Sequence, residues 1–198
     1  MLKAIKKLFE RQHFFCFATK LFIATEMIEL LRTRRSVRKF TDQPIEPGKV
    51  ELLKEAILRA PSSKNSKAGE YIFVDDQELI QKLAQCKLHG AAPLQTAKLA
   101  VVVLVDECKT AAWIEDSSIA SFVAHLTAHS LGLGSCWIQI RGREYSDEKM
   151  SEEYVRELLN IPEGLRVLSI VAIGYAQRQH EGHPISELDF GKIRSNGF

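Results

Sequence analysis

KLAVVVLVD, residues 98–106, is the stretch that decides the fold, because every residue between its two charged ends is apolar. Its valines favour extended backbone, and the run is long enough for a central strand buried on both faces. The run LRVLSIVAIGYA, residues 165–176, predicts a second strong strand. Shorter runs at 71–76 and 135–140 predict two further strands.

Helical patterns lie between these strands. Pro47 suits the first turn of one helix and Pro61 marks its end, while Gly132 is a natural C-terminal stop for a longer one. Ser146 is expected to cap the N-terminus of another. The predicted helices cover residues 27–36, 47–60, 76–86, 114–131 and 146–159. Because strands and helices mix without strict βαβ alternation, the sequence predicts an α+β fold with a mainly antiparallel central sheet.

The composition is that of an ordinary globular protein. Of 198 residues, 45% are hydrophobic and 26% are charged, which suits one domain with a large core. A net charge of +2 is too small to indicate a nucleic-acid partner, and no apolar run is long enough for a membrane span. The four cysteines are far apart without a C-x-x-C pair, so a reducing, cytoplasmic location is expected.

Residues 1–26 are predicted to be an extension outside a domain at 27–198. They are basic and then apolar, but Thr19 and Lys20 interrupt the apolar part and no clean cleavage site follows. Three readings stay open: a weak export signal, an amphipathic helical arm, and an upstream start codon with Met27 as the true start. We favour the last, because a continuous domain pattern begins at Met27.

The densest charge in the chain is RTRRSVRKF, residues 32–40, which holds four arginines and one lysine. A phosphate group accepts several charge-assisted hydrogen bonds, and guanidinium groups match its geometry. On charge alone, a solvated basic face is the commoner explanation. A nucleic-acid-binding segment is disfavoured, because the window is short and no aromatic stacking platform lies nearby.

Two further segments carry polar or glycine residues. APSSKNSKAGEYIFV, residues 60–74, places small hydroxyl and amide groups on a loop between a helix and a strand, where they can reach a planar ligand. LGLGSCWIQI, residues 131–140, precedes a strand and is therefore not a dinucleotide fingerprint, which follows one. Its glycines either let backbone approach a flat ring or simply end the preceding helix.

No metal ligand and no catalytic side chain is predicted. His125 and His129 lie four apart on a helix, which is a metal-binding spacing, but no third ligand is evident. Ordinary helix histidines are the better interpretation.

Together these segments resemble the nitroreductase family of FMN-dependent flavoproteins. RRSVRKF (34–40) is similar to the family's N-terminal signature, and APSSKNS (60–66) to its second. Three further blocks follow in the family's order: WIEDSSIA (113–120), SLGLGSCWI (130–138) and IPEGLRVLSIVAIGY (161–175). Five motifs in order, from about Met27 to the C-terminus, are specific for the superfamily but not for a substrate.

The resemblance implies helices on both faces of the sheet and an intertwined homodimer with two FMN sites at its interface. It assigns Arg34 and Ser36 to the FMN phosphate and ribityl chain, with Arg35 beside them, and Arg38 to the pyrimidine edge of the flavin. The second subunit would contribute a polar loop. That loop contains Ser62, Ser63 and Asn65.

The resemblance also assigns the strand and the tail. Trp137, Ile138 and Gln139 would line one face of the ring, with a backbone N–H near Gln139 pointing at flavin N5. Lys192 and Arg194 would close over the phosphate. In the segment between the strands, the candidates for further polar contacts are His89 and Gln95.

The activity implied is that of an NAD(P)H-dependent oxidoreductase, in which the flavin carries the electrons and no catalytic side chain is demanded. NAD(P)H would reduce FMN and leave before a nitroaromatic, quinone or similar small acceptor binds the same cleft. Relatives often continue the second motif with Gln-Pro-Trp, whereas this chain has Lys67-Ala68-Gly69-Glu70. This departure leaves open an FMN enzyme of flavin or haloaromatic chemistry, and a non-enzymatic flavin-binding protein. The sequence does not distinguish NADH from NADPH.

Overall fold

The structure is a computed structural model that describes residues 26–198, so the predicted extension lies almost wholly outside the described residues. The described chain divides into two compact units, one of residues 26–34 with 181–198 and the other of residues 35–180. In the first unit, residues 26–33 are helical, and the tail holds two short 3-10 helices. These are η3 (Ile185–Glu187) and η4 (Phe190–Lys192). The single domain expected at 27–198 stays a prediction.

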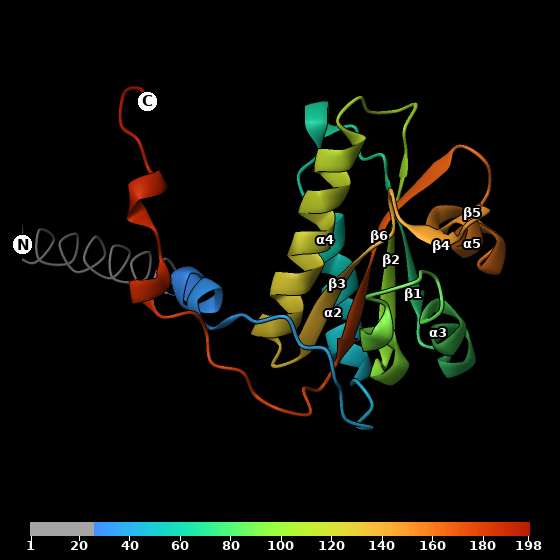
Figure 1. Ribbon diagram of the computed structural model, residues 1–198, viewed down its shortest axis with the longest axis horizontal. Helices are drawn as coiled ribbons and strands as arrows, with labels where there is room; N and C mark the ends of the chain where they lie inside the picture. The colour runs from blue at the N-terminus through green and yellow to red at the C-terminus, as the bar shows by residue number, and fades with distance from the viewer. Residues whose placement is uncertain (1–25) are drawn as a thin grey trace, which may run out of the picture. The chain divides into compact units, whose positions relative to one another are not determined.

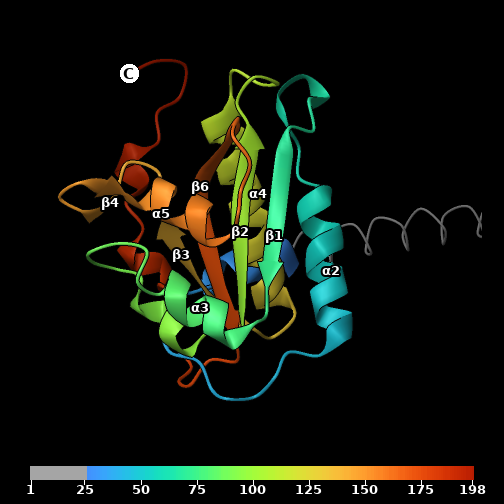
Figure 2. The ribbon, with the colours of Figure 1, turned by 90° about the vertical axis from the view of Figure 1, so that its right-hand side faces the viewer.

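The second unit is built on a four-stranded sheet in which every neighbouring pair is antiparallel. Figure 2 shows the strands side by side. Their order is β1 (Gly69–Val74), β2 (Leu99–Asp106), β6 (Leu165–Gly174) and β3 (Gly134–Gln139). The two long apolar runs form the central pair, and all of β2 except Asp106 is buried. The predicted antiparallel sheet and its central strand are confirmed.

Helices cover both faces of this sheet, as Figure 1 shows for α4 on one side and for α3 with α5 on the other. The four helices are α2 (Pro47–Leu58), α3 (Gln77–Leu83), α4 (Trp113–Ser130) and α5 (Ser151–Leu158). Leu53 of α2 and Ala124 of α4 pack in one core cluster, whereas Ile80 of α3 and Val155 of α5 pack in the other. The α+β class with helices on both faces is confirmed. None of the helices within residues 26–198 is both long and apolar enough to cross a membrane.

Helix α4 turns small residues toward the sheet. Ala120, Ala124 and Ala128 are buried, whereas the large residues Ile119 and Phe122 are 39% and 43% exposed. The small side chains let the helix lie close to β6 and β3. The large ones leave an apolar ridge on the outer side of α4 in this chain.

The helix expected at 146–159 begins later than predicted. Strands β4 (Glu144–Ser146) and β5 (Lys149–Met150) pair as a small hairpin, and only then does α5 begin. The prediction that Ser146 caps the helix is wrong. Its hydroxyl oxygen instead accepts the N–H of Glu148 inside the hairpin, at 3.4 Å.

A short extended segment, residues 36–40, lies against the sheet. Ser36 forms a parallel bridge with Ser135 at the start of β3, and Phe40 forms an antiparallel bridge with Ala176 beyond β6. The Val37 N–H donates to the Ser135 carbonyl at 2.9 Å. The segment that contains the cation cluster is therefore held at the β3 edge.

Two glycines make room for this segment. A Cβ built on Gly134 would lie 2.8 Å from the Cβ of Val37, and one built on Gly174 would lie 2.9 Å from the Cβ of Phe40. Both distances are too short for real contacts, and Val37 and Phe40 are themselves buried. Side chains at either glycine would push the segment away.

We therefore expect Gly174→Ala to lower the free energy of unfolding by about 1–3 kcal/mol, the usual cost of overpacking a core. Urea denaturation measures this. Gly48→Ala in α2 is the control, because nothing lies within 4 Å of a Cβ at that position. A loss as large in the control as in Gly174→Ala would contradict the steric explanation.

Candidate functional site

A cleft of about 530 Å³ lies beside β3, the edge strand of the sheet. Its volume is within the range of small-molecule sites. It is lined by Lys87, Leu88, His89, Trp137, Gln139, Gly142, Arg143 and Glu144. Two of the residues predicted to line a flavin ring, Trp137 and Gln139, therefore share a cleft.

The backbone of β3 offers hydrogen-bond donors on this side. Because the Ser135 carbonyl accepts from Val37, the backbone groups of Ser135 face away from β6. Backbone direction alternates along a strand, so the N–H groups of Trp137 and Gln139 face the same outer edge. The hydrogen bond from Lys87 Nζ to the Gln139 carbonyl, 3.1 Å long, agrees with this direction. A ligand in the cleft can therefore meet the N–H of Gln139.

The side chains on this strand differ in their access to a ligand. Trp137 Nε1 donates to Gln139 Oε1 at 3.0 Å, which fixes both partly exposed side chains. Ile138 is fully buried in the core and pairs with Ile170 of β6. Its side chain therefore packs in the core, and the prediction that Ile138 lines the ring applies only to its place on the strand.

Two cations lie close to the buried thiol of Cys136 on β3. Burial raises the pKa of Cys136, and the charges of Arg38 and Lys87 act in the opposite direction. Arg38 is exposed and Lys87 is half-buried. Arg38, which the resemblance assigns to the pyrimidine edge of the flavin, thus lies near β3, the strand assigned to the ring.

Burial also raises the pKa of Cys86 to about 11, so this thiol is neutral at physiological pH.

The remaining predicted phosphate contacts fall in both units. Ser36 is held at the start of β3 by its bridge to Ser135, and Arg35 precedes it, half-buried. Arg34, Lys192 and Arg194 belong to the other unit. There Lys192 Nζ lies 3.9 Å from Asp189, and Arg194 donates to the Gly191 carbonyl. Their assignments to the phosphate stay predictions.

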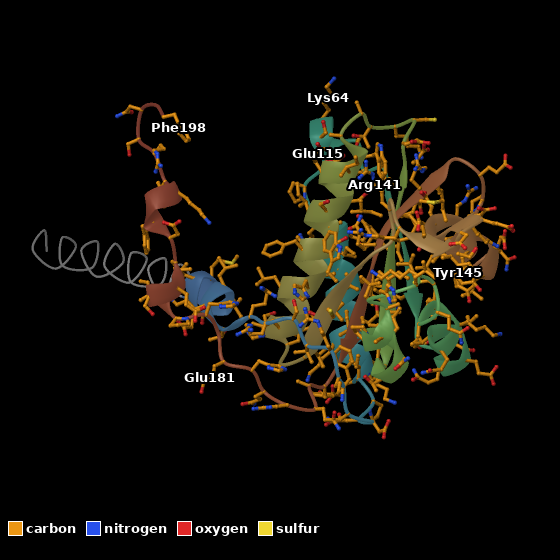
Figure 3. All side chains as sticks on the ribbon, viewed as in Figure 1. Lys64, Glu115, Arg141, Tyr145, Glu181 and Phe198 are labelled. Carbon is orange, nitrogen blue, oxygen red and sulfur yellow. The ribbon has the colours of Figure 1, made fainter. Side chains whose placement is uncertain are left out.

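The polar loop at residues 60–68 is anchored by a buried carboxylate. Asp116, in the first turn of α4, accepts the Ser63 N–H at 2.8 Å and the Thr110 hydroxyl at 3.0 Å. Figure 3 shows Lys64 and Glu115 at this end of α4. The carboxylate therefore fixes the part of the loop assigned to FMN by resemblance.

The loop conformation is unusual for its residue types. Lys64, Asn65 and Lys67 have φ values of 51°, 53° and 49°, in the left-handed region. The Ser62 hydroxyl accepts the Lys67 N–H at 3.1 Å, which closes the loop on itself. Such backbone persists only where surrounding contacts hold it, and it is concentrated at functional sites.

This loop and the cleft belong to opposite edges of the sheet. The loop leads into β1, and β1 is three strand positions from β3. At the usual strand spacing this is about 14 Å. One chain therefore does not bring Ser62, Ser63 and Asn65 to the cleft that contains Trp137 and Gln139.

One histidine and one glycine of this region serve to hold α4 in place and to end it. His125 is buried, and its Nδ1 is hydrogen-bonded to the Ser135 hydroxyl, which ties α4 to β3. Gly132, with φ of 75°, ends α4 in a Schellman arrangement, because Leu133 N–H donates to the Ala128 carbonyl. Among residues 26–198, no three potential metal-binding side chains lie together.

Sequence reasoning missed three residues of this region. Asp116 lay in a motif used for the resemblance, but its burial carried no sequence signal. Lys87 and Arg143 lie in the cleft yet belong to no motif. Of the two candidates in the segment between the strands, His89 lines the cleft, whereas Gln95 is not among its lining residues.

We expect Asp116→Asn to loosen the loop, because an amide cannot accept both hydrogen bonds through two oxygens. The cost should be about 1–3 kcal/mol in the free energy of unfolding. Trypsin should cleave faster after Lys64 and Lys67, both exposed, as followed by mass spectrometry under native conditions. Glu115→Gln, which changes the exposed neighbour, is the control, and equal cleavage in both variants would contradict the anchoring role.

Comparison with known proteins gives consistent results. The model of the nitroreductase family matches residues 31–175. A protein of Archaeoglobus fulgidus, provisionally named an NADH dehydrogenase/NAD(P)H nitroreductase, is 33% identical over 79% of this chain and 88% of its own. An FMN-dependent nitroreductase from Clostridium difficile has a TM-score of 0.85 and 42% identity, covering 86% of this chain and 99% of that one. The NADPH:FMN oxidoreductase of Vibrio harveyi, solved with NAD+, has a TM-score of 0.73 and 27% identity, over 86% and 77%. This chain therefore belongs to the nitroreductase family.

Proposed function

We propose that the protein is an FMN-dependent oxidoreductase that uses NAD(P)H to reduce nitroaromatic, quinone or similar small acceptors. The observation that carries this proposal is the outer edge of β3, where the N–H groups of Trp137 and Gln139 face a cleft and Arg38 lies near the same strand. The FMN-dependent relative from Clostridium difficile and the NADPH:FMN oxidoreductase of Vibrio harveyi support it.

The residues present fit FMN. A phosphate dianion needs cations and hydroxyl donors, and Arg35 and Ser36 are adjacent on the segment at the β3 edge. Arg38, further along the same segment, is available for the pyrimidine edge of the ring. The ring needs a donor for its N5 atom, which the Gln139 N–H would supply. We propose Arg34, Lys192 and Arg194 as further phosphate contacts. Ile138 is proposed to act only as part of the strand that supports the ring.

When bound, FMN supplies the two-electron transfer, so that NAD(P)H, a proton and a quinone give NAD(P)+ and the reduced quinol. The Gln139 N–H would orient the ring, and Arg38 would place positive charge at its pyrimidine edge. The hydrogen bond from Trp137 to Gln139 keeps the wall of the cleft in place. Co-substrate and acceptor would use this cleft in turn.

We also propose a homodimer in which each cleft is completed by the partner. The loop at 60–68 is held at the edge opposite the cleft of its own chain, which suits donation to a second one. Large apolar residues are exposed on the two helices next to that loop and on the tail. They are Leu52, Leu58, Ile119, Phe122, Ile185, Leu188, Phe190 and Ile193.

The domain boundary and location are proposals as well. The family match begins at residue 31, which supports an FMN-binding domain at 27–198 and an extension before it. Three cysteines of the described chain, Cys86, Cys108 and Cys136, are free thiols, which supports a reducing cytoplasm.

Arg34→Ala should weaken FMN binding by about 10- to 100-fold, the range for losing a charged hydrogen-bond partner of a phosphate. The fold should be retained, because the residue contributes nothing to either core cluster. Fluorescence titration of the apoprotein with FMN measures the Kd. Arg32→Ala removes an exposed arginine that pairs with Glu29 and should bind FMN normally. Unchanged affinity in Arg34→Ala would count against the phosphate assignment.

Measurements on the same protein preparations distinguish this function from its alternatives. FMN binding without acceptor-dependent oxidation of NAD(P)H would indicate a flavin-binding protein instead of an enzyme. Turnover of free flavin or haloaromatics, with none of quinones or nitroaromatics, would indicate the other FMN chemistry. A protein that cannot be reconstituted with FMN would contradict the proposal altogether.

Phe122→Asp should convert the dimer to monomer, because it puts a charge on the apolar ridge of α4. Light scattering after size exclusion measures the mass, and FMN affinity should fall with it. Met150→Asp changes an equally exposed apolar residue on the β5 hairpin and is the control. A dimer that persists in Phe122→Asp would show that this ridge is not the interface.

A further inference from the structure

The cleft beside β3 carries more positive than negative charge. Lys87 and Arg143 line it from two separate loops. His89, two residues after Lys87, also lines the cleft, and Glu144 is the one carboxylate among the lining residues. Nothing in the proposed FMN site requires Lys87 or Arg143. Their convergence on one space therefore calls for a ligand other than the phosphate of FMN.

Lys87 is hydrogen-bonded to β3, the strand that borders the cleft. Its Nζ lies 3.1 Å from the carbonyl oxygen of Gln139, whose N–H faces the same edge. Burial is the main cause that lowers the pKa of Lys87, and the nearby charge of Arg143 also lowers it, against an opposing effect of Cys86. The two cations thus repel each other across the cleft, and an anion bound between them would relieve that repulsion.

The two walls of the cleft are joined by backbone and ring contacts, which restrain the positions of Lys87 and Arg143. The Leu88 N–H donates to the Glu144 carbonyl at 3.2 Å, which links the loop after α3 to the start of β4. Tyr145, labelled in Figure 3, stacks on Tyr154 of α5 with ring centroids 4.3 Å apart. The charged positions are therefore set by packed elements on both sides.

We propose that Lys87 and Arg143 make this cleft select an anionic aromatic acceptor, a nitro- or quinoid ring that carries a carboxylate, over its neutral counterpart. The inference rests on the proposed function, because it names the substrate class of the same cleft. For a nitroaromatic, one turnover consumes NAD(P)H and a proton, and yields NAD(P)+, the nitroso compound and water.

The 2′-phosphate of NADPH is the other anion that such cations could bind. It is attached to the adenosine end of the coenzyme, far from the nicotinamide that must reach the ring. Lys87 instead lies at Gln139, the residue proposed to contact the ring itself. A small acceptor that approaches the ring would meet this charge directly.

The test uses the FMN-loaded protein and the matched acceptors 4-nitrobenzoate and 4-nitrobenzamide, which differ in charge. The ratio of kcat/KM for anion over neutral should exceed one. This ratio should fall about fivefold in Lys87→Gln, because one partly screened ion pair is lost. It should also fall in Arg143→Gln. Lys87→Arg should retain the preference. Lys82→Gln, which removes an exposed lysine of α3 outside the cleft, should leave the ratio unchanged.

Binding provides a readout apart from turnover. Calorimetry of the oxidised, FMN-loaded protein should show benzoate binding more tightly than benzamide, with the difference lost in Lys87→Gln. If Lys87→Gln does not fold, Arg143→Gln decides the question. A wild-type protein that binds both equally, or a folded Lys87→Gln or Arg143→Gln variant that keeps the wild-type preference, would overturn the inference.

Two controls separate this inference from the proposed function. Turnover of neutral 1,4-benzoquinone without any preference for 4-nitrobenzoate would refute the inference and leave the function standing. Absence of NAD(P)H oxidation with every acceptor would refute the function, while the benzoate titration still decides on the anion site. A change in Lys87→Gln that is confined to the NADPH-over-NADH ratio would assign the cations to the coenzyme and overturn the acceptor assignment.

Discussion

The close approach of residues 36–40 to the sheet is the constraint on which the site depends. Val37 and Phe40 are buried where Gly134 and Gly174 leave room for them, so the segment is fixed beside β3. Arg38, two residues before Phe40, is then held next to the same strand while staying exposed. A cation cluster that could have been a solvated face is thereby placed along a row of backbone donors.

An exposed edge strand is usually a liability, because its free N–H and C=O groups invite pairing with other chains. Here the outer edge of β3 borders a cleft instead. The opposite edge of the sheet carries the loop at 60–68, which the Asp116 carboxylate holds in a conformation that lysine rarely adopts. Each edge thus has part of a binding site, and the proposed dimer would join the two parts.

The sequence predicts the strands well because burial on both faces requires long apolar runs, as at 98–106 and 165–176. It predicts the end of α4 because Gly132 is one of the few residues that adopt the required φ cheaply. It fails at Ser146, because strands of two or three residues have no periodicity that separates them from a helix start. It also misses Lys87, whose position depends on Gln139, 52 residues away. The sequence also left two explanations open for Gly134, close approach to a flat ring or the end of a helix. Its role in making room depends on where Val37 lies.

FMN-dependent turnover can be tested by the absorbance spectrum of the purified protein under anaerobic conditions, before and after NADH or NADPH is added. We expect a yellow protein whose flavin bands bleach on addition of a reduced nicotinamide and return when a quinone follows. The cofactor released on denaturation should be FMN and not FAD. A colourless protein that stays colourless after incubation with FMN would contradict the account.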